Sequence, residues 1–213
     1  MDKLTADDLI YGYTNGIFPM ADHDGTLYWY SPDPRAIIPI DTYKPSKSLK
    51  PILNKKLFDI RFNTNFRAVM THCAAPRGED DETWISEEII DAYCLLHEKG
   101  FAHSVEAYLD DELVGGLYGV AIGGVYFGES MFYIAPNSSK VAFHFLIEKL
   151  REQGYILLDT QFINDNVKRY GAIEIPRADY LKLLREGLKL DCQFHDKVAD
   201  NYFVRTKYMD EFE

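Results

Sequence analysis

Residues 125–133 read VYFGESMFY and residues 155–163 read YILLDTQFI, and we expect these two runs to form the centre of the fold. Both are rich in aliphatic and aromatic residues, which predicts two strands. Side chains two apart on a strand share a face, so Asp159 and Gln161 should project together. A carboxylate and a carboxamide are costly to bury unless they are hydrogen-bonded, so the pair should either line a cleft or brace a buried turn. Glu129 repeats this anomaly in the first run.

The chain has 213 residues, of which 46% are hydrophobic and 27% charged, as in an ordinary globular protein. This length allows one core with a small appendage and excludes a disordered or fibrous protein. The longest apolar run, near residues 113–127, is interrupted by glycines and tyrosines, so we expect no spanning helix and a cytoplasmic location. Three widely separated cysteines and six histidines form no ligand motif. We therefore expect reduced thiols and no metal.

A basic segment stands out in a chain whose net charge is −11. Between residues 44 and 67 the single acid is Asp59, and the cations are Lys44, Lys47, Lys50, Lys55, Lys56, Arg61 and Arg67. Such a run is most often a solvated surface. It is also what a protein needs if it grips only the end of a nucleic acid, because phosphate binding depends on Lys and Arg.

Periodicity and turn residues predict the other elements. A capping box at Thr5 predicts a short helix that ends at Gly16, and the proline-rich, aromatic stretch 17–35 is expected to be irregular. We expect residues 1–35 to form a small N-terminal lobe and residues 36–213 the main domain. Strands are expected at 58–62, 102–109, 112–122, 125–133, 155–163 and 172–175, and helices from 48, at 65–73, 86–100, 140–153, 166–170 and 178–188.

The order of these elements predicts an α+β fold. The strands between residues 102 and 133 are joined by tight turns and should form an antiparallel meander. A long helix then returns the chain, so that 155–163 lies beside 125–133 in a mixed sheet with flanking helices.

Short motifs in these elements resemble the leucyl/phenylalanyl-tRNA-protein transferases. They are FGESMF (127–132), LDTQF (158–162), GA (171–172) and EIPR (174–177), preceded by GIFP (16–19), SPDPRA (31–36), TWI (83–85), HEKG (97–100), AHSVE (102–106) and LVGGLYG (113–119). They occur in the order of that family and extend over residues 9–184.

The resemblance implies an N-acetyltransferase-like fold for the main domain. The glycine-rich turn with which such folds cradle the pyrophosphate of coenzyme A is missing at 133–140, so neither acetyl-CoA nor another cofactor is expected. The implied reaction moves a leucyl, phenylalanyl or methionyl group from aminoacyl-tRNA to the N-terminal amine of proteins that begin with Lys or Arg. These proteins would thereby be marked for N-end-rule degradation, and the enzyme is expected to be a monomer.

For catalysis, the resemblance points to Asp159 and Gln161. We expect Asp159 to accept a hydrogen bond from the Gln161 amide, so that the Gln161 carbonyl oxygen can receive an N–H of the attacking amine. Glu129 is expected to hold either the α-amine of the donor or the cationic end of the acceptor. Positioning of this kind can supply several kcal/mol without a residue of tuned pKa.

The donor side chain requires an apolar hole, and the terminal adenine an aromatic platform. The residues expected to bind substrate are Met20, Trp84, Leu117, Phe127, Glu129, Ser130 and Met131. Trp84 is suited to stacking on the adenine, whereas Met20 stands where the family usually has Trp. Ser130 does not fit the Gly-x-Ser-x-Gly pattern of a nucleophile. Lys47, Lys50, Lys55 and Lys56 occupy the place of the family's tRNA-binding cations.

Two alternatives follow from the same residues. A ligase that uses aminoacyl-tRNA to modify a small amine or a peptidoglycan precursor would need a similar site. A module that binds RNA ends without catalysis would agree with Met20 and with the acidic charge.

Overall fold

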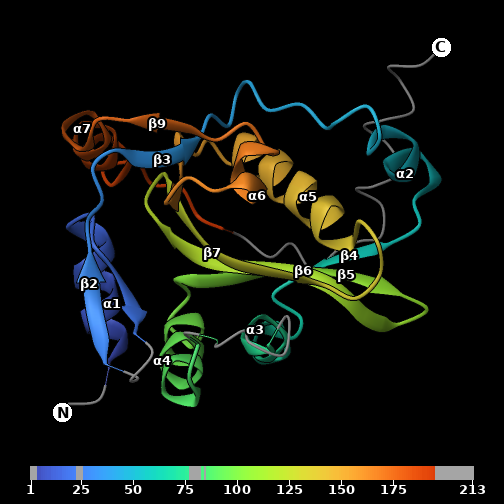
Figure 1. Ribbon diagram of the computed structural model, residues 1–213, viewed down its shortest axis with the longest axis horizontal. Coiled ribbons are helices and arrows are strands. Elements are labelled where there is room, and N and C mark those ends of the chain that lie inside the picture. The colour runs from blue at the N-terminus through green and yellow to red at the C-terminus, as the bar shows by residue number, and fades with distance from the viewer. Residues whose placement is uncertain (1–3, 23–25, 77–82, 84, 195–213) are drawn as a thin grey trace.

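The computed structural model describes residues 4–22, 26–76, 83 and 85–194, and Figure 1 shows its helices and strands. The helices are α1 (Ala6–Thr14), α2 (Lys50–Lys55), α3 (Phe66–Ala74), α4 (Glu87–Glu98), α5 (Ser138–Glu152), α6 (Asp165–Lys168) and α7 (Arg177–Gly187). The strands are β1 (Phe18–Ala21), β2 (Leu27–Tyr30), β3 (Arg35–Ile38), β4 (Asp59–Phe62), β5 (Ala102–Leu109), β6 (Glu112–Ile122), β7 (Val125–Tyr133), β8 (Leu157–Gln161) and β9 (Ile173–Ile175).

The main sheet has seven strands in the order β4-β5-β6-β7-β8-β3-β9. Only β7 and β8 are parallel, and the other neighbouring strands are antiparallel. The meander β5 to β7 has the predicted bounds, and α5 returns the chain so that β8 pairs with β7. The predicted α+β class, mixed sheet and crossover are therefore confirmed.

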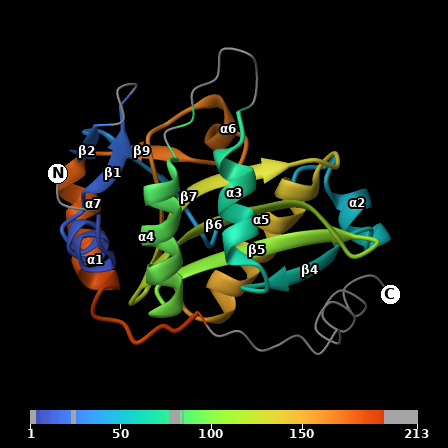
Figure 2. The ribbon, with the colours of Figure 1, turned by 90° about the horizontal axis from the view of Figure 1, so that it is seen from below.

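Apolar side chains cover both faces of this sheet and form two cores. Figure 1 shows α5 and α6 on one face and α3 and α4 on the other, which Figure 2 views directly. The core under α3 and α4 includes Met70 and Tyr93, and it also takes in Leu9 of α1. The core under α5 includes Leu146 and Leu150. Burial of apolar surface on both sides of the sheet stabilises this arrangement.

The N-terminal segment is more regular than its composition predicts. α1 begins as expected, because the Thr5 side chain and the Asp8 carboxylate cap each other's backbone N–H groups. Residues 17–35 were expected to be irregular, but β1 and β2 form a two-stranded antiparallel sheet. Trp29 of β2 packs on Gly12 of α1, where a Cβ atom would lie 2.1 Å from the indole ring. Leu9, in the predicted lobe, shares a core with residues of the main sheet. The division into a lobe and a main domain therefore stays a prediction.

Sequence patterns missed β3 altogether. Its four residues are all buried, and it pairs antiparallel with β8 on one side and β9 on the other. A short run directly after two prolines gives no alternation from which a strand could be inferred. β3 places Arg35 beside the strand that carries Asp159 and Gln161.

The sheet opens between β7 and β8. Their parallel pairing ends at Phe127 and Asp159. Beyond this point β7 has one residue more than its other neighbour β6, and β8 has one residue more than its other neighbour β3. Glu129 is the extra residue where the β6–β7 register shifts, and Thr160 where the β3–β8 register shifts. Bulges of this kind bend a strand and redirect its side chains. In the part of the chain that the structure describes, no helix is long and apolar enough to span a membrane.

Candidate active site

A pocket of about 310 Å³ lies where β7 and β8 separate. Its apolar lining includes Met20, Leu117, Met131, Phe143, Leu146 and Tyr170. Its polar lining includes Glu129, Ser130, Thr160, Gln161, Asn164 and Asn166. An apolar hollow with a few polar groups on one wall is typical of a small-molecule site, and this volume is at the small end of the usual range.

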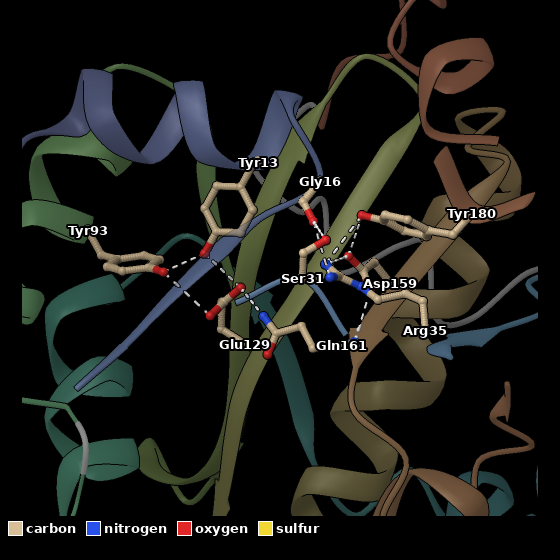
Figure 3. Close-up of polar contacts among 9 residues, drawn as sticks. All are labelled: Tyr13, Gly16, Ser31, Arg35, Tyr93, Glu129, Asp159, Gln161 and Tyr180. Carbon is tan, nitrogen blue, oxygen red and sulfur yellow. Dashed lines mark hydrogen bonds and ion pairs between the residues drawn. The ribbon is translucent and has the colours of Figure 1, made fainter. Parts of the chain in front are cut away.

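Glu129 joins Tyr13, Tyr93 and Gln161 in one hydrogen-bonded network, as Figure 3 shows. Its Oε1 atom accepts hydrogen bonds from the Tyr13 hydroxyl and from Gln161 Nε2, each at 2.8 Å. The Tyr93 hydroxyl lies 3.4 Å from Oε2 and within hydrogen-bond distance of the Tyr13 hydroxyl. The Gln161 amide is thus oriented by Glu129, with its nitrogen toward the carboxylate.

The surroundings of Glu129 bring its titration close to neutral pH. Burial has the largest effect and raises the pKa of its carboxyl to about 7. The hydrogen bond from Tyr13 lowers this pKa, whereas the nearby charge of Asp159 raises it. Burial and the charge of Glu129 raise the pKa values of Tyr13 and Tyr93 well above their ordinary value. Both phenols therefore remain hydrogen-bond donors, while Glu129 can gain or lose a proton at physiological pH.

This pKa predicts that Glu129 makes the fold less stable as the pH rises. The folded pKa of about 7 exceeds the ordinary value of 4.5, so the folded state binds more protons than the unfolded state between these limits. The stability that Glu129 contributes is fully present below pH 4.5 and is lost as the pH rises through about 7. Thermal melts of wild type and Glu129→Gln should therefore diverge across this range.

A matched control is Glu98→Gln, which removes an exposed carboxylate at the end of α4. Its melting temperature should follow that of wild type at every pH. Parallel curves for Glu129→Gln and wild type would contradict a raised pKa at Glu129.

Asp159 lies in a second buried network next to the first. Arg35 Nε donates a hydrogen bond to Asp159 Oδ1 at 2.9 Å, and Arg35 Nη2 donates one to Oδ2 at 2.6 Å. The Tyr180 hydroxyl donates to Oδ2 at 2.7 Å. Arg35 and Tyr180 are 1% and 0% exposed. Burial favours loss of the Arg35 proton, but the charge and hydrogen bonds of Asp159, with smaller contributions from other neighbours, together outweigh it and raise the pKa of the guanidinium.

The expected hydrogen bond between the side chains of Asp159 and Gln161 is not formed. Asp159 Oδ1 instead accepts the backbone N–H of Gln161 at 2.9 Å, and the Gln161 amide nitrogen donates to Glu129. The reason is local: Gln161 has φ +66°, and Thr160 is an extra residue in the strand, so the simple alternation of faces ends at Asp159.

The structure brings some of the residues predicted to bind the substrate together in one pocket. Leu117 and Met131 line the pocket, as do Met20 and Ser130. Phe127 does not line it, because its ring packs on Tyr13 in the core on the other face, with ring centroids 4.8 Å apart. Phe127 precedes the bulge, and so it points away from the opening between the strands. Trp84, the predicted adenine platform, falls outside the described residues.

The basic segment contains two kinds of cation. Lys47, Lys50, Lys55 and Lys56 lie on or beside α2, and all are exposed. Arg61 pairs with Asp59 and Asp111, and Arg67 with Glu87 and Asp91. α2 packs into the same core as α5 through Ile52 and Leu53, so this helix lies on the face of the sheet that holds the pocket (Figure 1).

Sequence reasoning gave no role to four residues of these networks. In the sequence, Tyr13 and Tyr93 look like ordinary aromatic residues on the apolar faces of α1 and α4. Tyr180 stands in a helix without any motif, whereas Arg35 gave a usable signal: a single cation inside a buried apolar run must find an anion. Among the residues that the structure describes, no three His, Cys, Asp or Glu side chains are grouped to hold a metal ion.

Comparison with known proteins gives concordant results along the chain. A family model described as "Leucyl/phenylalanyl-tRNA protein transferase" matches residues 37–185, and one for the N-terminal domain of that family matches residues 2–33. A protein from Herpetosiphon aurantiacus that bears this name is 52% identical over 90% of this chain and 98% of its own length. Its namesake from Prosthecochloris aestuarii is 46% identical over 90% of this chain and 99% of its own length.

Likeness to solved structures is much weaker. A ribosomal-protein-alanine N-acetyltransferase from Brucella melitensis matches with a TM-score of 0.37 and 14% identity, over 53% of this chain and 86% of that chain.

Proposed function

The chain belongs to the leucyl/phenylalanyl-tRNA protein transferase family, and we propose the following reaction for it. A leucyl, phenylalanyl or methionyl group moves from the ribose ester of an aminoacyl-tRNA to the N-terminal amine of a protein that begins with Lys or Arg. The protein is an aminoacyltransferase, and we infer that it acts in the cytoplasm as a monomer and marks its acceptors for degradation.

One observation supports this reaction most directly: Glu129 and Gln161 meet at 2.8 Å on one wall of an otherwise largely apolar pocket. The carboxylate attracts the α-ammonium group of the acceptor. The Gln161 nitrogen is occupied by Glu129, which leaves the Gln161 carbonyl oxygen to receive an N–H of the incoming amine. The apolar residues opposite receive the donor side chain.

The chemical step needs one proton acceptor and a well-placed amine. The α-ammonium group, with an ordinary pKa of about 7.7–8.0, first gives a proton to the Glu129 carboxylate. Its nitrogen then attacks the ester carbonyl carbon, and the new C–N bond forms while Gln161 holds the amine. The C–O bond to the ribose breaks, and the ribose oxygen takes the second proton lost by the nitrogen. A base whose pKa is near the working pH is well matched to this transfer.

The pocket also accounts for a broad choice of donor. Met20 and Met131 line it, and a thioether side chain is unbranched and adapts its shape to a neighbour. A hydrophobic pocket discriminates only weakly between side chains that differ by about one methylene. Leucyl, phenylalanyl and methionyl groups can therefore share one site.

The exposed lysines around α2 predict how tRNA binding depends on salt. Each lysine that neutralises a phosphate releases counterions and adds about one unit to the slope of log Kd against log salt. Changing Lys47, Lys50, Lys55 and Lys56 together to Gln should therefore weaken binding and flatten this slope by roughly three to four units. Filter binding of tRNA from about 50 to 200 mM salt measures it.

Arg61→Gln is the internal control, because this cation lies in the same segment but already pairs with Asp59 and Asp111. Its slope should match that of wild type. If the quadruple variant also keeps the wild-type slope, the α2 lysines do not contact tRNA.

The proposed function is tested by incubating the protein with leucyl-tRNA and a peptide that has an N-terminal Arg. The mass of the peptide should increase by one leucyl residue, and a copy with an acetylated N-terminus should stay unchanged. Acylation of small amines but not of the peptide would favour the ligase alternative. Binding of tRNA without any transfer would favour the RNA-end-binding alternative.

A further inference from the structure

We propose that Arg35 and Tyr180 are positioning residues that act through Asp159, and that Asp159 supports the backbone of Gln161 instead of contacting substrate. This inference rests on the proposed function, in which Gln161 receives the amine. Figure 3 shows the arrangement: Arg35 and Tyr180 surround Asp159 on the side away from Glu129.

The hydrogen-bonding capacity of Asp159 is fully used within the protein. Oδ1 accepts Arg35 Nε and the Gln161 backbone N–H, both at 2.9 Å. Oδ2 accepts Arg35 Nη2 at 2.6 Å and the Tyr180 hydroxyl at 2.7 Å. A carboxylate offers about four lone-pair sites, so none is left for a substrate. Asp159 is also 0% exposed and does not line the pocket.

Gln161 needs this support because of its backbone. Its φ of +66° lies in the left-handed region, which costs an L-residue other than Gly about 1–2 kcal/mol. The bond from its N–H to Asp159 Oδ1 holds the strand end in that conformation. The conformation in turn directs the Gln161 side chain to Glu129, away from Asp159.

The Arg35 guanidinium, which reaches Asp159 from β3, is itself held from three directions. It stacks between the rings of Phe18 and Tyr180, 4.7 and 4.5 Å from their centroids. Its Nη1 atom also donates to the carbonyl oxygen of Gly16 at 3.2 Å. The guanidinium is thus held by β1, by the turn after α1 and by α7.

The start of α7 is joined to the same region. The backbone N–H of Arg177 donates to Asp33 at 3.0 Å, and Arg177 Nη1 donates to the carbonyl oxygen of Ser31 at 2.8 Å. These bonds fix the segment that leads into β3 against the helix that carries Tyr180. Two segments that are distant in sequence, β3 and α7, therefore converge on the Asp159 carboxylate of β8 and set the position of Gln161.

Tyr180→Phe tests the inference with little change in packing. The ring that covers Arg35 remains, but Asp159 loses one of its four hydrogen bonds and its carboxylate is held less firmly. Small displacements of a group that orients a reactant reduce the rate more than they reduce binding. We expect kcat for peptide leucylation to fall roughly 3- to 10-fold, with the KM for leucyl-tRNA unchanged.

The matched control is Tyr108→Phe, which removes a hydrogen bond of 3.0 Å from a buried tyrosine to the Glu106 carboxylate, on β5 and remote from the pocket. Both variants should lose similar thermal stability, but Tyr108→Phe should keep the wild-type kcat. Arg35→Lys is a second variant that keeps the charge but cannot form the paired bonds, and it should lower kcat further, about 10- to 100-fold.

Three outcomes would overturn the inference. They are a wild-type kcat in both Tyr180→Phe and Arg35→Lys, an increase in KM in place of a decrease in kcat, and equal losses of kcat in Tyr180→Phe and Tyr108→Phe. A wild-type protein that transfers no leucine would instead overturn the proposed function, so the two failures are distinguishable.

Discussion

Gln161→Ala is expected to lower kcat about 10²- to 10³-fold, the usual cost of removing one preorganised hydrogen-bonding group from an active site. The amine then loses its acceptor, and Glu129 loses the donor at 2.8 Å that fixes its Oε1 atom. Binding of leucyl-tRNA should change little, because the apolar wall of the pocket is untouched. Single-turnover kinetics with an N-terminal-Arg peptide separate the two steps.

Two further variants separate the side chain from the backbone. Gln161→Gly tolerates a φ of +66° and should be about 1 kcal/mol more stable than Gln161→Ala, yet equally slow. Gln193→Ala removes the same kind of side chain from an exposed position and should behave as wild type. Turnover of folded Gln161→Ala within about threefold of wild type would remove Gln161 from the mechanism.

Arg35→Met should be the most destabilising single change in the site. It leaves the Asp159 carboxylate buried without its cation, and breaking a buried ion pair from one side costs about 3–5 kcal/mol. For a chain of this size, each kcal/mol lowers the melting temperature by about 2–4 °C, so a decrease of roughly 6–20 °C is expected. Calorimetry of both proteins at one pH measures it.

The double variant Arg35→Met with Asp159→Asn should recover much of this loss. The Asn side chain at position 159 is a neutral amide, so no unpaired charge is buried. Its carbonyl oxygen can still accept the Gln161 backbone N–H. Arg61→Met removes two surface ion pairs, with Asp59 and Asp111, and should cost less than about 1 kcal/mol. A melting temperature for Arg35→Met close to that of Arg61→Met would show that the buried pair contributes little.

The framework of the fold was predictable because its signals are local. β5, β6 and β7 have the expected bounds, since Asp110 with Asp111 and Gly123 with Gly124 mark the turns between alternating runs. The cap at Thr5 and the crossover to β8 follow from equally local patterns. In contrast, β3 is too short to show a period, and β1 and β2 lie in a stretch whose prolines and glycines suggested irregular structure.

The site was predictable in composition but not in geometry. Glu129 and Gln161 were anomalous polar residues in apolar strands, and both line the pocket. The direction of Gln161 depends on a left-handed residue and a bulge, which no alternation rule contains. The partners of Asp159 come from β3 and α7, and pairing over such distances is a property of the tertiary fold.

The long separation between these partners also bears on when the enzyme can first work. Arg35 precedes Asp159 by 124 positions, and Tyr180 follows it by 21. While a ribosome is still synthesising the chain, the guanidinium emerges long before its anion and α7. Contacts between segments so far apart in sequence are slow to form, because a long loop must be closed first. A nascent chain that ends before α7 lacks Tyr180 and therefore one of the groups that hold Asp159.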